Sequence, residues 1–469
     1  MARAITTEEK EYAQELLRRA RRAMDLLGDY DQAGIDRLCQ AVGWATANEK
    51  TATRLATMGV DESGLGDRDG RPNKRFKIMG ILRDALRQKS IGVIEEIPEK
   101  GIVKYAKPAG VIASLVPVTN AALTEPGNGI YALKCRDAII FSPHPASTKT
   151  TFETVRIMRE TLKRLGAPED AFQCIEKPSI PLAQEMMSIC DLTIATGGSA
   201  MVRAAYSSGK PAYGVGAGNA TMLIDETANI EEAARNTRLS KTSDFGSGCS
   251  ADGNLIVEES IYDRFLGQLQ VEGGYLVTDS EKHLLKNILW DSEGHRTSST
   301  VARPASRIAE IAGFSIPAGK SFLIVKECQI GREHLFSSEK LCPVLSIFKY
   351  SGGFANGLEM VRRIYEVGGK GHSCGIYSFD DDHIHQLALM APVSRIMVRQ
   401  PQSKANAGAF NNGMPMTSSM GCGIWGGNIT NENVSLKHYM QVTWVARPIQ
   451  EDRPSEAELF GEFHNTETL

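Results

Sequence analysis

Residues 191–208 read DLTIATGGSAMVRAAYSS, and they join a short apolar run to a helical stretch through two glycines. The run from 191 to 196 has the length and composition of a buried strand. The stretch 199–208, which begins after Gly197 and Gly198, has the composition of a helix. Strands that alternate with helices form parallel sheets, so a repeat of this unit along the chain would predict an α/β fold.

The same alternation is present on both sides of this unit. A buried strand at 137–143 precedes a helix at 146–165, and a loop and strand at 213–225 precede a helix at 229–241. We therefore predict a doubly wound, Rossmann-type parallel sheet. The pattern begins again after Cys249, which indicates a second α/β domain. Its predicted elements are a helix at 262–269 and strands at 254–259, 322–327, 344–350, 374–379 and 394–399.

The two ends of the chain differ from this pattern. Residues 1 to about 90 have the apolar spacing of helices, and residues 91–110 alternate around a Pro-Glu-Lys-Gly turn as a hairpin does. The apolar segment 438–449 is typical of a strand. We expect it to pair with the 91–110 hairpin or with a neighbouring subunit.

Composition excludes several classes of protein. The chain of 469 residues has a net charge of −3, which gives no basic surface for nucleic acid. Its nine cysteines include no pair at CxxC spacing, so we expect neither a metal site nor a disulfide framework, and a reducing cytoplasm is the expected compartment. The charged N-terminus lacks a signal-peptide core, and no apolar run reaches the ~18 residues of a membrane span, so no membrane contact is expected.

Cys249 is the candidate nucleophile. It follows a glycine- and serine-rich approach in the segment 241–252, KTSDFGSGCSAD, at the boundary of a predicted helix. A thiol reacts as its thiolate, which requires a partly open setting rather than an apolar core. The alternative is a small buried side chain with no chemical role, which is the commoner use of a free cysteine.

Asn120 is the candidate partner of this thiol. A thiolate that attacks an aldehyde creates an oxyanion, and preorganised hydrogen-bond donors must stabilise it. Asn120 follows a buried strand in the sequence Pro117-Val-Thr-Asn, so its amide could be such a donor. The alternative is that Asn120 only caps a turn.

Eight motifs in unchanged order resemble the CoA-acylating aldehyde dehydrogenases, and among them most closely the acylating sulfoacetaldehyde dehydrogenases. The family implies an aldehyde-dehydrogenase-like α/β fold with a cofactor-binding domain, expected at 1–240 with the 91–110 hairpin, and a catalytic domain, expected at 241–430. It also implies a β oligomerisation segment, expected at 431–469, and a homodimer or homotetramer. The motifs are PVTN (117–120), IFSPHP (140–145), TGG (196–198), GVGAGN (214–219), SKT (240–242), EKLCPV (339–344), GHSCG (371–375) and MGCGIWGGNITNENV (420–434).

The resemblance assigns roles residue by residue. It makes Cys249 the nucleophile, and it makes Asn120 and the Cys249 backbone N–H the oxyanion donors. Glu339 would bind the nicotinamide-side ribose, although a solvated loop carboxylate is the alternative. His372 would assist the thiol or position the acyl group, although a lone histidine is more often structural. The other expected cofactor-binding residues are Thr119, Ser142, His144, Pro145, Ser147, Gly197, Gly198, Ser199 and Gly216.

The expected reaction depends on a missing carboxylate. Hydrolytic aldehyde dehydrogenases carry a glutamate that activates the deacylating water, and the matching position here is Gly214. Without this base we expect the thioacyl enzyme to persist until the thiol of coenzyme A attacks it. The expected co-substrates are therefore CoA and NADP or NAD. NADP is favoured because the loop 144–150 has no acidic residue and offers Ser147, Thr148 and Lys149 to a 2′-phosphate.

The expected substrate is a small polar aldehyde. The approach to the cysteine and the segment 402–415 are more polar than an alkyl pocket requires, which favours a small polar aldehyde. The resemblance to the acylating sulfoacetaldehyde dehydrogenases implies that this aldehyde is sulfoacetaldehyde. Ser250, Lys241, Arg203 or Lys404 would bind its sulfonate. The alternatives are acetaldehyde or propanal, a hydrolytic or semialdehyde-type enzyme, and a catalytically silent scaffold. Enclosure in a bacterial microcompartment is left open.

Overall fold

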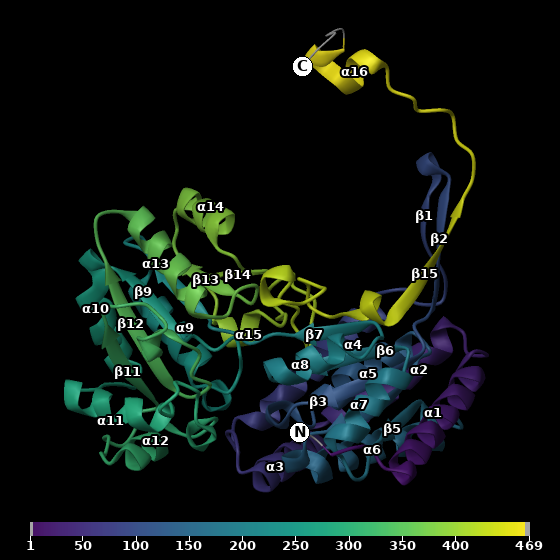
Figure 1. The fold of residues 1–469 in the computed structure, drawn as a ribbon, viewed down its shortest axis with the longest axis horizontal. Helices are drawn as coiled ribbons and strands as arrows, with labels where there is room; N and C mark the ends of the chain where they lie inside the picture. Colours follow the sequence, from purple (N-terminus) through teal and green to yellow (C-terminus); the bar gives the residue numbers. More distant parts are fainter. Residues whose placement is uncertain (1–2, 465–469) are drawn as a thin grey trace.

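Five parallel strands in the order β5-β4-β3-β6-β7 form the sheet of the N-terminal lobe. The computed structural model describes residues 3–464, and Figure 1 shows this lobe in purple to teal. All residues of β3 (Val111–Val116) and β4 (Ala138–Pro143) are buried, as expected for central parallel strands. The other strands are β5 (Phe172–Cys174), β6 (Leu192–Thr196) and β7 (Ala212–Val215). This order confirms the predicted doubly wound sheet.

Helices cover both faces of this sheet because successive residues of β3 point to opposite sides. Val111 packs against α1 (Thr7–Leu27) and α7 (Ile180–Ile189). Ile112 faces the other layer, which contains the fully buried α5 (Thr124–Lys134). The remaining helices of the lobe are α2 (Gln32–Ala47), α3 (Glu49–Ser63), α4 (Arg75–Leu86), α6 (Thr148–Arg164) and α8 (Ser199–Tyr206).

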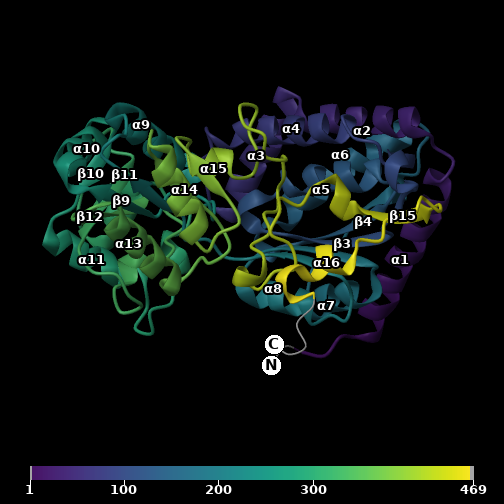
Figure 2. The ribbon, with the colours of Figure 1, turned by 90° about the horizontal axis from the view of Figure 1, so that it is seen from above.

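A second parallel sheet of seven strands, in the order β10-β11-β12-β9-β8-β13-β14, forms the other lobe, and Figure 2 shows the two lobes side by side. Its core is again apolar on both faces. Its strands are β8 (Thr221–Ile224), β9 (Asn254–Glu258), β10 (Gly274–Leu276), β11 (Phe322–Glu327), β12 (Val344–Tyr350), β13 (Cys374–Tyr377) and β14 (Ile396–Val398). The helices are α9 (Ile230–Lys241), α10 (Glu259–Val271), α11 (Asp279–Leu289), α12 (Ala305–Ala312), α13 (Phe354–Val367), α14 (Asp381–Met390) and α15 (Gln402–Ala405).

The change from one sheet to the other lies earlier than the predicted boundary at residue 240. β8 pairs in parallel with β9 and β13, so it is a central strand of the second sheet, and α9 packs on α10 of the same lobe. The crossover therefore falls in the loop between Val215 and Thr221. The sequence does not reveal this crossover, because a buried parallel strand has the same apolar pattern in either sheet.

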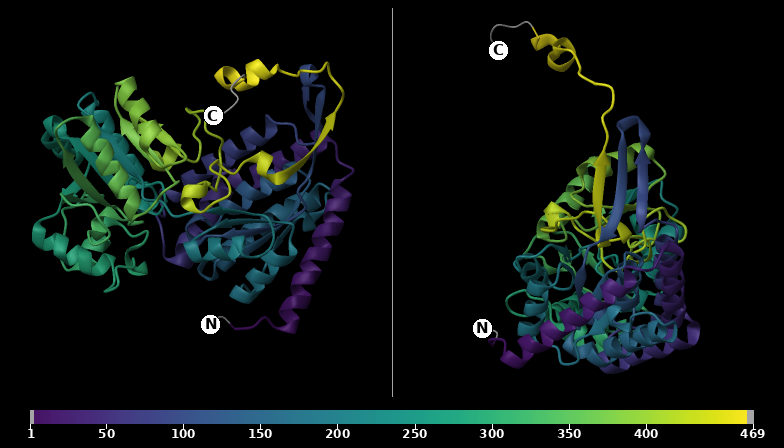
Figure 3. Two further views of the ribbon diagram at one scale, coloured as in Figure 1. Left: turned by 45° about the horizontal axis from the view of Figure 1, so that its top comes forward. Right: turned by 90° about the vertical axis from the view of Figure 1, so that its right-hand side faces the viewer.

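A three-stranded antiparallel sheet forms an arm that projects from the N-terminal lobe, as Figure 3 shows. It consists of the predicted hairpin, β1 (Gly92–Ile97) and β2 (Ile102–Pro108), and of β15 (Met440–Ala446), which pairs along β2. The expected pairing of the C-terminal segment with the hairpin of its own chain is thus confirmed. Beyond β15, residues 447–463 are exposed, and α16 (Glu456–Phe460) lies far from both lobes.

Candidate active site

A cleft of about 1140 Å³ is lined by residues of both lobes. On the N-terminal side its wall is formed by the loops after β3, β4, β6 and β7, which all end at one edge of the sheet. Ligands of open α/β sheets bind at this edge, outside the carboxyl ends of the strands. On the other side lie the cysteine segment 247–250 and the loop that carries Glu339.

Cys249 lines this cleft, and His372 lies fully buried behind it. The Sγ of Cys249 is 3.0 Å from Nε2 of His372, and Nδ1 of His372 is 2.8 Å from Oγ of Ser373. The serine hydroxyl can donate or accept, so it can serve either tautomer of the imidazole. This arrangement of nucleophile, base and orienting hydroxyl is the one expected for an activated thiol.

The cysteine–histidine pair is neutral in the cofactor-free protein. Burial, followed by the charge of Glu339, raises the pKa of the Cys249 thiol to about 12. Burial, followed by the charge of Arg395, lowers the pKa of His372 to about 3. The S–H group therefore donates to a neutral Nε2, and the thiolate forms only when the proton moves to His372 during the reaction.

We expect the alkylation of Cys249 in the cofactor-free enzyme to keep accelerating with pH toward the thiol pKa of about 12, rather than to level near the ~8.5 of an unperturbed thiol. Glu339→Gln should shift this profile to lower pH, because the repulsion of the thiolate by the carboxylate is lost. Iodoacetamide labelling with mass spectrometry at Cys249 checks both, since the exposed Cys328 also reacts. A profile that levels below pH 8 contradicts the neutral pair.

Asn120 faces the same cleft from the loop after β3. Its Oδ1 accepts a hydrogen bond of 2.8 Å from Nζ of Lys74, which leaves the Nδ2 protons without an acceptor within residues 3–464. The backbone N–H of Cys249 also has no acceptor in this part of the chain. Two donors without acceptors thus belong to residues that line the same cleft as the thiol, and an oxyanion site requires such donors.

The loop before Cys249 has an unusual backbone. Asp244, Phe245 and Gly246 have φ values of 49°, 52° and 67°, a run of three left-handed residues of which only one is glycine. Such conformations cost on the order of 1 kcal/mol each and persist when the surroundings fix them. The buried Asp244 side chain does so, since it binds Arg71 at 2.9 Å and Lys74 at 2.8 Å. These cations hold the pKa of Asp244 well below its usual range, against the effect of burial.

Glu339 lines the cleft and is connected to the cysteine loop. Its Oε1 accepts from the Gly218 N–H at 3.1 Å, and its Oε2 accepts from Arg296 at 3.1 Å. A Cβ on Gly218 would lie 1.9 Å from the carbonyl oxygen of Cys249, so this close approach requires glycine. Burial raises the pKa of Glu339, and Arg296 opposes the rise.

The structure brings most of the predicted cofactor residues to the cleft, but not all. The lining includes Thr119, Ser142, His144, Pro145, Gly197, Gly198 and Gly216. Ser147 is buried, with its Oγ 3.4 Å from the His144 carbonyl, and it does not line the cleft. Ser199 begins α8 directly after the two glycines.

The predicted substrate residues separate into two pairs. Ser250 and Lys404 line the cleft. Lys241 is buried at the end of α9. Burial lowers its pKa, and the charges of Cys342, Asp252 and Glu339 oppose this change. Arg203 is exposed on α8. Neither lines the cleft, so the expectation that they bind the sulfonate is not supported.

Sequence reasoning missed four ionisable residues of the cleft: Lys74, Lys77, Asp244 and Arg296. Lys74 and Lys77 are one helical turn apart, and a cation at this spacing is normally a solvated helix face. Only Asp244 could have been noticed in the sequence. It lies in the glycine-rich segment before Cys249, and aspartate adopts the left-handed conformation more readily than most residues. Nothing in the sequence alone places the others in a cleft.

Gly214, the position of the missing glutamate, lies beside the cleft rather than on its surface. A Cβ here would be 2.5 Å from Val202 and 2.8 Å from the ring of Tyr206, and Val215, Gly216 and Ala217 form the lining instead. A glutamate at 214 would therefore collide with α8. Substitution at this position would report on packing rather than on water activation.

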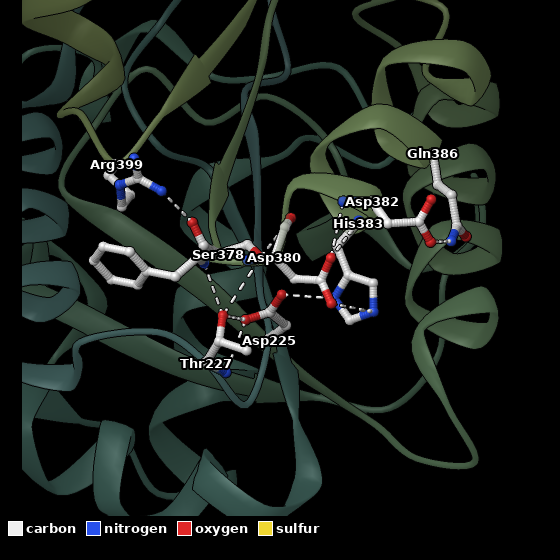
Figure 4. A network of polar contacts seen from close by, with 9 residues as sticks. Asp225, Thr227, Ser378, Asp380, Asp382, His383, Gln386 and Arg399 are labelled. Atoms are coloured by element: carbon white, nitrogen blue, oxygen red, sulfur yellow. Dashed lines mark hydrogen bonds and ion pairs between the residues drawn. The ribbon is translucent and has the colours of Figure 1, made fainter.

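One group of metal-binding residue types, Asp225, Glu226 and His383, is found in the second lobe, away from the cleft residues. Figure 4 shows its surroundings. One oxygen of the buried Asp225 accepts from Nδ1 of His383 at 2.7 Å, and the other accepts from Thr227 at 2.6 Å. The cluster thus satisfies its own polar atoms and anchors the start of α14.

No helix between residues 3 and 464 has the length and apolar character needed to cross a membrane.

This chain is similar to known proteins in both sequence and fold. Residues 4–279 match the aldehyde dehydrogenase family. A sulfoacetaldehyde dehydrogenase of an Acholeplasma species is 42% identical over 452 residues, which cover 95% of this chain and 93% of the relative. An acetylating aldehyde dehydrogenase of Geobacillus thermoglucosidasius superposes with a TM-score of 0.91 at 34% identity, over 96% of this chain and 99% of that structure. A propionaldehyde dehydrogenase of Rhodopseudomonas palustris, solved with CoA and an acylated cysteine, gives a TM-score of 0.82 at 25% identity, over 93% and 97% of the chains.

Proposed function

Because this chain belongs to the aldehyde dehydrogenase family, we propose that it is a CoA-acylating oxidoreductase that interconverts an aldehyde and its acyl-CoA through a thioester on Cys249. One observation carries the proposal. Among the described residues, Glu339 and Asp244 are the carboxylates that line the cleft, and both are held by cations. No free carboxylate is therefore available to activate water, and His372 is already protonated by the Cys249 thiol when the thioester forms, so we propose that a thiol rather than water releases the acyl group.

The chain's own residues account for the steps around the aldehyde. Sγ of Cys249 attacks the carbonyl carbon, its proton moves to Nε2 of His372, and the carbonyl electron pair moves to the oxygen, which Asn120 Nδ2 and the Cys249 N–H bind. A bound nicotinamide supplies the hydride acceptor. The CoA thiol attacks the carbonyl carbon of the thioester that remains and releases its proton to solvent; the C–S bond to Cys249 breaks, and the leaving thiolate takes back its proton from Nε2 of His372. The residues after β3, β4 and β6 at the edge of the cleft fit a dinucleotide, and the position of Glu339 in the cleft lining supports a role in binding its ribose.

The substrate proposed is sulfoacetaldehyde. The sulfoacetaldehyde dehydrogenase similar to this chain supports it, and so do the cations of the cleft. Lys77 donates to the carbonyls of Ala407 and Gly408 and, at 3.6 Å, to Sδ of Met416, and a sulfonate oxygen would replace this weak thioether acceptor. Burial lowers its pKa to about 8, so it is mostly protonated at pH 7. Lys404 and Ser250 line the same cleft.

A panel of aldehydes tests the reaction and the substrate together. Sulfoacetaldehyde, acetaldehyde, propanal and succinate semialdehyde should each be assayed with both nicotinamide cofactors, with and without CoA. We expect CoA dependence throughout and a kcat/KM for sulfoacetaldehyde at least about tenfold above the uncharged aldehydes, since a charge-assisted hydrogen bond contributes roughly 1.5–3 kcal/mol. Preference for acetaldehyde or propanal would reject the sulfonate, and CoA-independent turnover would reject the acylating reaction.

We propose NAD as the preferred cofactor, which differs from the sequence prediction of NADP. The carboxylate of Glu62, from α3, accepts from the N–H groups of Lys149 and Thr150 at 2.7 and 2.8 Å. An acid thus lies at the start of α6, beside the loop that would otherwise receive a 2′-phosphate. The sequence did not reveal it because Glu62 is far away in the chain.

Glu62→Gln should improve the use of NADP relative to NAD by on the order of tenfold, because a negative charge that repels the 2′-phosphate is removed. The amide oxygen can still accept from α6, so the fold should be retained. The ratio of kcat/KM for the two cofactors, with thermal melting as control, measures the effect. An unchanged ratio would show that Glu62 does not face the cofactor.

The arm supports assembly into a homodimer or homotetramer. β15 exposes Val442 and Trp444 on one face and Val445 on the other, and Trp444 retains 58% of its accessible surface. Residues 447–463 continue from the end of β15 and extend away from both lobes. Apolar surface of this kind marks a protein interface. Sedimentation velocity should give a dimer or tetramer, and a monomer at micromolar concentration would reject the proposal.

A further inference from the structure

Lys74 connects the two halves of the proposed reaction centre. It lies immediately before α4, and its side chain is 26% exposed. Its Nζ donates to Oδ1 of Asn120 at 2.8 Å, to the carbonyl of Thr119 at 3.0 Å and to Oδ2 of Asp244 at 2.8 Å. One ammonium group thus binds both the oxyanion-donor loop and the loop that leads to Cys249.

These three contacts use the whole donor capacity of the group. An ammonium has three N–H protons and no acceptor, and Lys74 has three oxygen partners. No proton is left for an anionic substrate, whereas one of the three acceptors of Lys77 is only the thioether sulfur of Met416. Although Lys74 lines the cleft, its bonds point to a role within the protein.

The contact with Lys74 determines which end of the Asn120 amide faces the cleft. An amide can rotate by 180°, which exchanges its oxygen and its NH₂ group. Because Lys74 can only donate, the oxygen must face Lys74 and the NH₂ group must face away from it. Only this orientation presents donors to a developing oxyanion. The opposite orientation would place a lone pair there and would repel the negative charge.

Asp244 fixes Lys74 in turn. Its carboxylate is buried and is also bound by Arg71, by the Asp67 N–H at 2.8 Å and by Ser247 at 3.1 Å. The left-handed run 244–246 directs this carboxylate toward α4, five residues before the nucleophile. The Lys74–Asp244 ion pair thus links the loop that carries Asn120 to the loop that leads to Cys249.

We propose that Lys74 is a positioning residue that orients the Asn120 amide as an oxyanion donor and that Asp244 holds Lys74 in place. The inference rests on the proposed function, because it assumes that an oxyanion forms beside Asn120. It predicts that Lys74 acts through Asn120 and not on the thiol itself.

A double-mutant cycle tests the proposal through the first turnover with aldehyde and cofactor, before CoA is added. Lys74→Met should slow this step by roughly 10- to 100-fold in the natural protein, but by less than about threefold in Asn120→Ala, where no amide remains to be oriented. Lys74→Arg, which retains a charged donor, should recover part of the rate. Lys89→Met, a substitution at an exposed position three residues after the end of α4, should have no effect.

Two further measurements separate the possible failures. Iodoacetamide labelling of Cys249 should be unchanged in Lys74→Met, since alkylation forms no oxyanion, and thermal melting reports any loss of folding. An equal rate loss in both Asn120 backgrounds, or slower alkylation in a folded variant, would overturn the positioning role. If the natural protein itself oxidises no aldehyde, the proposed function fails, whereas a normal first turnover in Lys74→Met rejects this inference alone.

Discussion

Cys249→Ala is expected to abolish aldehyde oxidation, with a loss of at least about 10³-fold, because the reaction requires a covalent bond to this sulfur. The thiol has no apolar packing role that would explain such a loss, since it lies at the surface of the cleft. Cofactor binding and the melting temperature should change little. Steady-state turnover, with fluorescence titration of the cofactor, measures both expectations.

The matched control is Cys328→Ala, which removes an exposed thiol of the same protein. Full activity in this variant and none in Cys249→Ala would assign the chemistry to a single cysteine. Retention of even a few per cent of the natural kcat by Cys249→Ala would contradict a mechanism through a thioester. Cys249 would then be a small side chain with no chemical role.

Asn120→Asp should lower kcat by roughly 10²–10³, the range observed when one oxyanion donor is lost. This substitution is nearly isosteric. Aspartate still accepts from Lys74, and it caps turns as well as asparagine does, but it offers no donor to the cleft. Asn120→Ala should give a loss of the same order.

The comparison of these two variants separates the oxyanion role from a turn cap. A cap would be preserved in Asn120→Asp and lost in Asn120→Ala, so only the second variant would then be impaired, chiefly in thermal stability. The structure already argues against the cap, because the side-chain oxygen of Asn120 binds Lys74 rather than a backbone N–H. Equal activity of the natural protein and Asn120→Asp would remove Asn120 from the mechanism.

The sequence pattern predicted individual strands and helices, because these depend on neighbouring residues. β4, β6 and α8 could be predicted from runs such as 137–143 and 191–208, since apolar length and flanking glycines determine them. The membership of β8 in the second sheet could not be predicted, because pairing partners are chosen by tertiary packing. The boundary at residue 240 was therefore placed too late.

In the candidate site, too, residues in sequence motifs could be predicted and residues positioned by tertiary packing could not. Cys249, Asn120 and Glu339 lie in motifs with fixed spacing, and all three face the cleft. Lys241 and Arg203 were plausible by charge, but the burial of one and the exposure of the other depend on how α9 and α8 pack. Lys74 and Glu62 act on residues 46 and 87 positions away in the chain, and no local pattern reveals such contacts.

The fate of the thioacyl enzyme tests the central claim most directly. Rapid mixing of the enzyme with sulfoacetaldehyde and NAD, without CoA, should give a burst of about one NADH per active subunit and then almost no further reaction, because both cleft carboxylates are held in ion pairs and cannot activate water. Subsequent addition of CoA should restart turnover. Sustained NADH formation without CoA, at a rate comparable to the CoA-dependent one, would show that a base does activate water and would contradict the acyl-CoA reaction.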